Sequence, residues 1–270
     1  MTTERSFRFG RALHLVGIAG FPVSAAAAAA AADRVGIIML NAGMVHRVGP
    51  FRLHVTMARR LNACGYPTLR FDMSSVGDSG ASAESQSQAL QVRADVADAM
   101  DLMQEQAGCT RFVLIGLCSG AQSAHTVACT EPRVAGAVFL DGYAYRTFGF
   151  RLRHYLPRLL SLPRWGKFLA RRLRPSKGRS ANVFAIWFPP LAQARRDLTG
   201  MLDRGLTLRF IFSGGAIRYF NHPRQLRECY GDLATRPRMS VRQLKNADHT
   251  YVLEVDRKLL LDDIVAWLQS

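Results

Sequence analysis

The 270-residue sequence lacks a hydrophobic run long enough to cross a bilayer. Its nearest approach, the alanine-rich stretch Ala25–Ala32, is far shorter than a spanning helix, and the charged residues Asp33 and Arg34 end it. We interpret this stretch as a low-complexity connection between two strands, with a short helix within it. Internal repeats are also absent, which argues against a solenoid or a propeller.

The cysteines lack the spacing of a metal or redox motif. The five cysteines form no C-x-x-C pair, and none stands at metal-ligand spacing from a histidine. We therefore expect no metal and no cofactor. An odd number of cysteines, with no recognisable signal peptide, favours a reducing cytoplasm as the location.

Acidic residues are few, and the excess of basic over acidic residues is concentrated in one segment of the chain. The chain has 36 Lys and Arg against 20 Asp and Glu, and the segment 142–204 alone has fourteen basic and two acidic residues. One interpretation is a solvated lid over an acyl pocket. A second is contact of residues 151–179 with an anionic membrane surface, which would make the protein peripheral to the inner face of the membrane. Nucleic acid is not expected as a partner, because no recognised motif accompanies the charge.

Apolar runs alternate with helical patterns along most of the chain, which predicts an α/β fold with a mostly parallel sheet and helices on both faces. The predicted strands are Ser6–Phe9, Leu13–Ile18, Val35–Leu40, Pro67–Asp72, Arg111–Ile115, Val134–Leu140, Leu206–Phe212 and Met239–Leu244. The predicted helices are Leu53–Leu61, Ala89–Met103, Ala121–Ala128 and Leu259–Leu268. The gap 142–190 is too long for a loop. We therefore expect a core of residues 1–141 and 191–270, with residues 142–190 inserted as a basic cap after the strand that ends at Asp141.

The most informative motif is a short turn between a strand pattern and a helix pattern. Residues 116–120 read G-L-C-S-G, with Cys118 between two glycines. This spacing is typical of a nucleophile elbow, a strained turn that raises the central residue above the sheet edge. The glycines avoid steric clashes, and the first amides of the following helix can stabilise an oxyanion.

Ser119 is the rival nucleophile, because serine is the commoner choice at an elbow. If Ser119 were central, Leu117 and Ala121 would stand at the two glycine positions. A helix N-terminus and a histidine partner both favour the thiolate, which is the reactive form of cysteine. We therefore favour Cys118, with a buried cysteine that only fills space as the non-catalytic alternative.

Two further residues fit the order nucleophile, acid, histidine. His249 follows the last predicted strand and precedes the last helix, so it is the candidate base. No carboxylate stands in residues 213–221, where the acid usually follows the preceding strand. Asp141, at the end of an earlier strand, is therefore the candidate acid, with a helix cap as its structural alternative. Asp248 is expected to form a local turn.

The oxyanion needs two amide donors. Ser119 follows the nucleophile and would supply one N–H, and the loop after Val35–Leu40 would supply the other through Ala42 or Met44, with Gly43 permitting close approach. Neighbouring loop residues are candidates for substrate binding: Asn41, His46 and Arg47. Asp72 and Asp78 are expected to fix loops beside the site, and His125 is expected to face the core or another helix.

Together these residues resemble the α/β-hydrolase superfamily over nearly the whole chain. The G-D-S-G sequence at 77–80 resembles the lipase and serine-aminopeptidase-like branch. The G-L-C-S-G-A motif and the A-D-H-T motif at 247–250 are similar to hydrolases associated with exosortase and exopolysaccharide gene clusters. Cysteine at the elbow resembles dienelactone hydrolases and polyhydroxyalkanoate synthases, whose Cys, Asp and His act in hydrolysis and in acyl transfer respectively. The resemblance says little about substrate.

The sequence thus predicts hydrolysis of a small carboxylic ester or thioester through an acyl-Cys118 intermediate. Two alternatives stay open. The same thioester could pass its acyl group to an alcohol or amine, which would make the protein an acyltransferase. Because the acid is missing from its usual position, the chain could also be a catalytically weak, membrane-associated binding protein.

Overall fold

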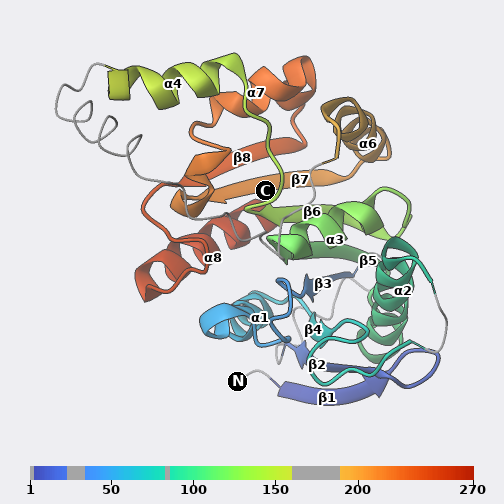
Figure 1. Cartoon of the computed structure of the whole chain (residues 1–270). Helices are drawn as coiled ribbons and strands as arrows, with labels where there is room; N and C mark the ends of the chain where they lie inside the picture. Colours follow the sequence, from blue (N-terminus) through green and yellow to red (C-terminus); the bar gives the residue numbers. More distant parts are fainter. Residues whose placement is uncertain (1–2, 23–33, 83–85, 160–188) are drawn as a thin grey trace, which may run out of the picture.

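Eight strands form a single sheet in the order β1-β2-β4-β3-β5-β6-β7-β8 (Figure 1). The computed structural model describes residues 3–22, 34–82, 86–159 and 189–270. The strands are β1 (Thr3–Phe9), β2 (Leu15–Phe21), β3 (Val35–Leu40), β4 (Thr68–Asp72), β5 (Arg111–Leu117), β6 (Val134–Leu140), β7 (Thr207–Ser213) and β8 (Met239–Leu244). The pairs β1–β2 and β2–β4 are antiparallel, and every pair from β4–β3 to β7–β8 is parallel. The predicted mostly parallel sheet is therefore confirmed.

Helices cover both faces of this sheet (Figure 1). They are α1 (Leu53–Ala63), α2 (Gln88–Ala107), α3 (Ser119–Ala128), α4 (Phe148–Leu159), α6 (Leu191–Asp203), α7 (Arg224–Tyr230) and α8 (Glu254–Leu268), with short 3-10 turns η2 (Pro50–Arg52), η3 (Gly214–Arg218) and η4 (Gly231–Thr235). α1 and α8 pack on one face, while α2, α3, α6 and α7 contribute to the core on the other.

The central strands are apolar at successive positions because both of their faces are covered. In β3, Ile37 and Met39 lie in the core with α1 and α8, whereas Ile38 and Leu40 lie in the core with α2 and α3. All four side chains are fully buried. A strand buried on both sides reads as a continuous apolar run, and this explains why these strands were predictable.

The predicted core elements are confirmed with small shifts at their ends. α8, for example, begins at Glu254, five residues before the predicted Leu259, and α2 extends to Ala107, where Gly108 in the left-handed conformation ends it. Among the described residues, the helices α4, α6 and α7 were not predicted from the sequence. Residues 25–32 and 160–188 lie outside the described part of the chain, so the proposed cap boundaries stay a prediction. None of the described helices is long and apolar enough to cross a membrane.

Candidate active site

Cys118 occupies a sharp turn between β5 and α3. Its φ of 58° and ψ of −117° are unusual for a residue other than glycine. The flanking glycines are needed because the chain folds tightly back on itself here. A Cβ on Gly116 would lie 2.0 Å from the carbonyl oxygen of Gly120, and a Cβ on Gly120 would lie 2.6 Å from that of Asn41. The turn therefore has the geometry that the G-x-C-x-G spacing predicts.

The structure brings Asp141 and His249 together with Cys118. His249 Nδ1 lies 2.7 Å from Asp141 Oδ2, and the imidazole also makes a side-chain hydrogen bond to Cys118. Asp141 follows β6 and is completely buried, while the His249 side chain is 40 % exposed. A continuous chain of contacts thus runs from a buried carboxylate through an imidazole to the thiol at the elbow.

Ser213 holds Asp141 in place, and the sequence analysis did not identify this role. Its N–H donates to Asp141 Oδ1 at 2.6 Å, and its hydroxyl donates to Oδ2 at 2.5 Å. The Tyr219 hydroxyl donates to the Asp141 carbonyl at 3.0 Å. Ser213 stands at the end of β7, beside the place where a carboxylate was sought. The candidate acid therefore stands one strand away from the place where a carboxylate was sought, and the β7 end supplies hydrogen-bond donors to it.

The electrostatics of this group favour a charged imidazole. The hydrogen bond that His249 donates to Asp141, followed by its interaction with Cys118, raises the pKa of His249 from 6.5 to about 10. At neutral pH His249 then carries a proton. An imidazolium of this kind can donate a proton to a leaving group.

The predicted oxyanion loop contacts the elbow directly. Gly43 N–H donates to Ser119 Oγ at 2.6 Å, so the Ser119 side chain ties the loop after β3 to the start of α3. Ala42 lies next to this contact and Met44 is exposed at the tip of the loop. Ser119 is also the first residue of α3, where backbone N–H groups have no partner within the helix. The oxyanion roles of Ser119, Ala42, Gly43 and Met44 stay predictions.

We expect Ser119→Ala to reduce kcat by no more than about tenfold, since a single neutral hydrogen bond contributes roughly 1 kcal/mol. The substitution removes the anchor of Gly43 and leaves the Ser119 backbone N–H in place. Steady-state hydrolysis of a p-nitrophenyl ester measures the effect. A loss approaching complete inactivity would instead favour Ser119 as the nucleophile.

A buried carboxylate organises the rest of this loop. Asp72 accepts hydrogen bonds from Arg47 N–H and Arg47 Nη1 at 2.5 Å each and from Asn41 Nδ2 at 3.2 Å. Asn41 is itself buried, and its Oδ1 accepts from Met73 N–H. Arg47 also pairs with Asp78 at 2.6 Å. The loop-fixing role expected for Asp72 and Asp78 is confirmed.

The polar contacts of Asn41 and Arg47 support a role in positioning this loop. Asn41 Nδ2 donates to the Val45 carbonyl and to Asp72, and Arg47 Nη1 pairs with Asp72 and Asp78. The substrate-binding role expected for both residues stays a prediction. His46 is exposed beside them, and its predicted contact with substrate stays a prediction.

We expect Arg47→Met to lower the free energy of unfolding by about 3 kcal/mol, because it leaves the fully buried Asp72 carboxylate without its cation. Urea denaturation measures the change. Arg59→Met is the matched control, since Arg59 pairs with Glu4 on an exposed surface and its removal should cost less than about 1 kcal/mol. Equal effects of the two substitutions would contradict the importance given to the Asp72 network.

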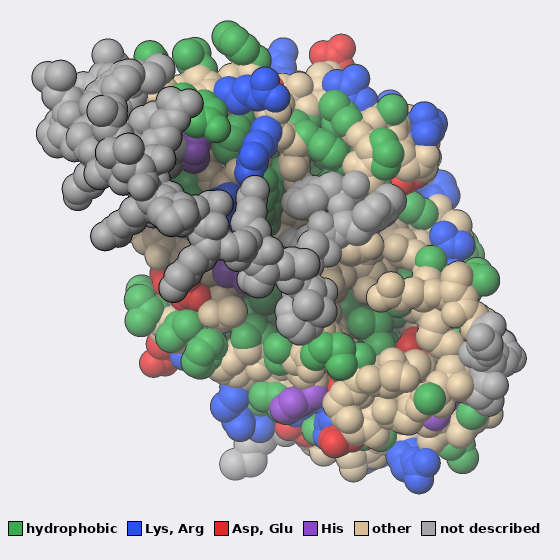
Figure 2. All heavy atoms as spheres, viewed as in Figure 1, with side chains coloured by type: hydrophobic (Ala, Val, Ile, Leu, Met, Phe, Trp, Pro, Cys, Tyr) green, Lys and Arg blue, Asp and Glu red, His purple; other side chains and the backbone are tan. Residues whose placement is uncertain are grey.

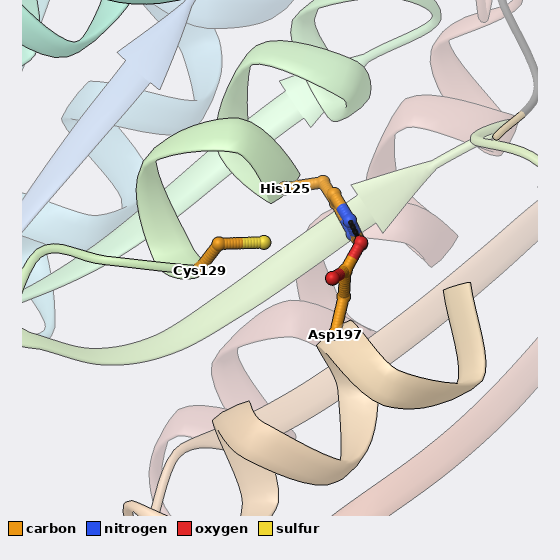
Figure 3. Close-up of side chains that lie close together, drawn as sticks. All are labelled: His125, Cys129 and Asp197. Carbon is orange, nitrogen blue, oxygen red and sulfur yellow. Dashed lines mark hydrogen bonds and ion pairs between the residues drawn. The ribbon is translucent and has the colours of Figure 1, made fainter. Parts of the chain in front are cut away.

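A second polar cluster lies between α3 and α6 (Figure 3). Donor atoms of His125, Cys129 and Asp197 lie within 4.8 Å of one another, close enough to hold a metal ion. However, both His125 ring nitrogens already have partners, namely the Tyr143 hydroxyl at 2.7 Å and Asp197 Oδ2 at 3.0 Å. Burial lowers the pKa of His125 and raises that of the Cys129 thiol to about 11. We interpret the cluster as a hydrogen-bonded link between the helices. His125 thus faces another helix, as predicted.

Asp248, the neighbour of the candidate base, forms the local turn expected of it. Its carboxylate accepts from the Thr250 N–H and hydroxyl and from the Val252 N–H. It therefore shapes the chain around His249 and does not replace Asp141.

Comparison with known proteins agrees with this architecture. The profile of the alpha/beta hydrolase family matches residues 37–261, so this chain belongs to the α/β-hydrolase family. A search of curated proteins found no match.

Several solved structures share the fold at low sequence identity. An esterase from Pyrococcus furiosus is 14 % identical, with a TM-score of 0.60 over 100 % of this chain and 92 % of its own. The mouse alpha/beta hydrolase domain-containing protein 10 is 14 % identical, with a TM-score of 0.53 over 94 % of each chain. An alpha-beta serine hydrolase homologue from Coxiella burnetii is 13 % identical, with a TM-score of 0.55 over 97 % of each chain. Similarity at this level concerns the fold alone.

Proposed function

We propose that the protein hydrolyses a carboxylic ester or thioester through an acyl-enzyme intermediate on Cys118. The observation that carries the proposal is the contact chain from buried Asp141 through His249 to the thiol at the elbow. Similarity to an esterase fold is compatible with it. The narrower resemblance to the exosortase-associated hydrolases belongs to the same proposal.

In the first step the Cys118 thiolate attacks the substrate carbonyl carbon, and a C–S bond forms. The carbonyl oxygen becomes an oxyanion, which the Ser119 N–H and an amide of the loop after β3 would stabilise. When the intermediate collapses, the bond to the leaving alkoxide or thiolate breaks, and His249 donates its proton to that group.

In the second step neutral His249 takes a proton from water as the water oxygen attacks the thioester carbon. The C–S bond breaks, the carboxylic acid leaves, and the proton on His249 restores the ion pair. Asp141 orients the imidazole and stabilises its charged form in both steps.

The test is a product analysis with p-nitrophenyl esters and acyl thioesters, in the presence and absence of an added alcohol. We expect the free acid to be the main product in both cases. If the ester of the added alcohol dominated, the protein would be an acyltransferase using the same intermediate. No turnover of any donor would favour the alternative of a binding protein.

A further inference from the structure

Large apolar side chains are exposed at the edge of the sheet that carries Cys118. Met44 follows β3, Phe148 and Leu152 follow β6, Ile217 follows β7 and Leu253 follows β8. The carboxyl ends of parallel strands meet at one edge, so these segments surround the elbow at the end of β5. The described turns at the opposite edge (64–66, 108–110, 130–133, 204–206 and 236–238) contain no exposed large apolar residue.

α4 is the most pronounced of these segments, because it is apolar on its outer face. Phe148, Leu152 and Tyr155 recur at helical spacing and are 82 %, 49 % and 54 % exposed. The opposite face of α4 is already attached to the protein, since Phe150 is buried and Arg153 donates to Asn221 Oδ1 and to Glu228. The contacts that attach α4 to Asn221 and Glu228 therefore come from the opposite face of the helix, and the outer apolar face does not contribute to them.

Basic residues surround this apolar face without nearby free carboxylates. Residues 142–159 contain four arginines and no acidic residue. Arg151 is exposed next to the apolar stripe, and Arg218 and Arg224 are exposed on the neighbouring η3 and α7. Arg146 is exposed just before α4, where it lies over the Phe150 ring and donates to the Arg218 carbonyl. The carboxylate that contacts α4, Glu228, is already paired with Arg153 at 2.6 Å. In Figure 2, blue and green side chains adjoin at the top of the molecule, where Figure 1 places α4 and α7.

We propose that this α4 surface, made of Arg146, Phe148, Arg151, Leu152 and Tyr155, docks on an anionic phospholipid bilayer. Apolar side chains flanked by arginines are the pattern that binds at the headgroup boundary, where the apolar groups enter the acyl region and the cations meet lipid phosphates. The sheet edge with Cys118 would then face the lipid. The proposal goes beyond the acyl chemistry and does not depend on it. The surface overlaps the segment 151–179, which the sequence analysis offered for contact with an anionic membrane, at residues 151–155. Residues 160–179 lie outside the described part of the chain.

The test is flotation of the full-length protein with vesicles of phosphatidylcholine containing phosphatidylglycerol, compared with vesicles of phosphatidylcholine alone. We expect binding to the anionic vesicles and little to the neutral ones. Phe148→Glu combined with Leu152→Glu should weaken binding by about tenfold or more, because it removes apolar burial. Arg151→Glu should also weaken it by about tenfold, because it reverses a charge at the surface.

Arg111→Glu is the matched control, since Arg111 is exposed at the opposite edge of the sheet and the change in net charge is the same. It should leave binding within about twofold, since charges beyond a Debye length are screened. Hydrolysis of a short soluble ester should be unchanged in every variant, so loss of docking is distinguishable from loss of chemistry.

The proposal would be overturned by equal binding to both kinds of vesicle, by wild-type binding of the Phe148 and Leu152 variant, or by equal losses with Arg151→Glu and Arg111→Glu. Absence of vesicle binding would also overturn it. If light scattering then detected a dimer that the Phe148 and Leu152 variant could not form, the surface would belong to a second copy of the chain.

Discussion

Replacing Cys118 with alanine is expected to lower kcat/KM for ester hydrolysis by about 10³-fold or more, because removal of the nucleophile leaves only binding and oxyanion stabilisation. The fold should persist, since the strained turn accepts a small side chain and the flanking glycines are unchanged. Steady-state kinetics with a p-nitrophenyl ester measure the loss, and circular dichroism checks the fold.

Two controls make this result specific. Ser119→Ala tests the neighbouring hydroxyl and should cost no more than about tenfold. Cys64→Ala removes a different free thiol, at the end of α1 and outside the site, and should have no effect on rate. If Cys118→Ala kept most of the activity while Ser119→Ala lost it, the assignment of the nucleophile would be wrong.

Asp141→Asn is expected to reduce kcat by roughly 10²–10⁴-fold, since the carboxylate orients the base and stabilises its charged form. The same substitution should lower the pKa of His249 from about 10 toward 6.5, because the hydrogen bond that His249 donates to Asp141 is the largest cause of its elevation. Histidine NMR titration, with His249→Gln used to assign the signal, measures this shift.

The pH dependence of stability has a definite sign for this pair. A histidine whose pKa is raised by folding stabilises the native state fully below about pH 6.5 and loses that contribution as the pH rises through about 10. The loss of stability in Asp141→Asn should therefore be larger at pH 6 than above pH 10. Asp248→Asn is the control, because Asp248 bonds to its own turn and its removal should leave the His249 pKa raised.

The core of the fold was predictable because its local signals agree with its tertiary packing. Runs such as Val35–Leu40 and Val134–Leu140 are apolar throughout and lie in the middle of the sheet with helices on both faces. The elbow was predictable for a different reason, namely that close backbone approach leaves no room for a side chain at Gly116 or Gly120. In both cases the packing, namely burial on two faces or close backbone approach, restricts which residue types can occupy these positions.

The support of the site was harder to predict, because it depends on contacts between residues distant in sequence. Nothing in the local sequence distinguishes Ser213 from other serines. Its role arises because β7 places its N–H and hydroxyl against Asp141, 72 residues away in sequence. From the sequence, Arg47 was a candidate for substrate binding, and its ion pair with the buried Asp72 is visible only in the fold. α4 was missed because residues 142–190 were read as an insertion from their length and charge alone. α6 lies within the predicted core segment 191–270, where no helix was predicted before Leu259.

The most direct test of the central claim is the intact-protein mass after brief exposure to a p-nitrophenyl ester, followed by peptide mapping. We expect one acyl adduct on the peptide that contains Cys118, absent in Cys118→Ala, retained in Ser119→Ala, and removed more slowly in Asp141→Asn than in the wild type. An adduct on Ser119, or turnover without any adduct on Cys118 in the wild type and in the slow Asp141→Asn variant, would contradict the account.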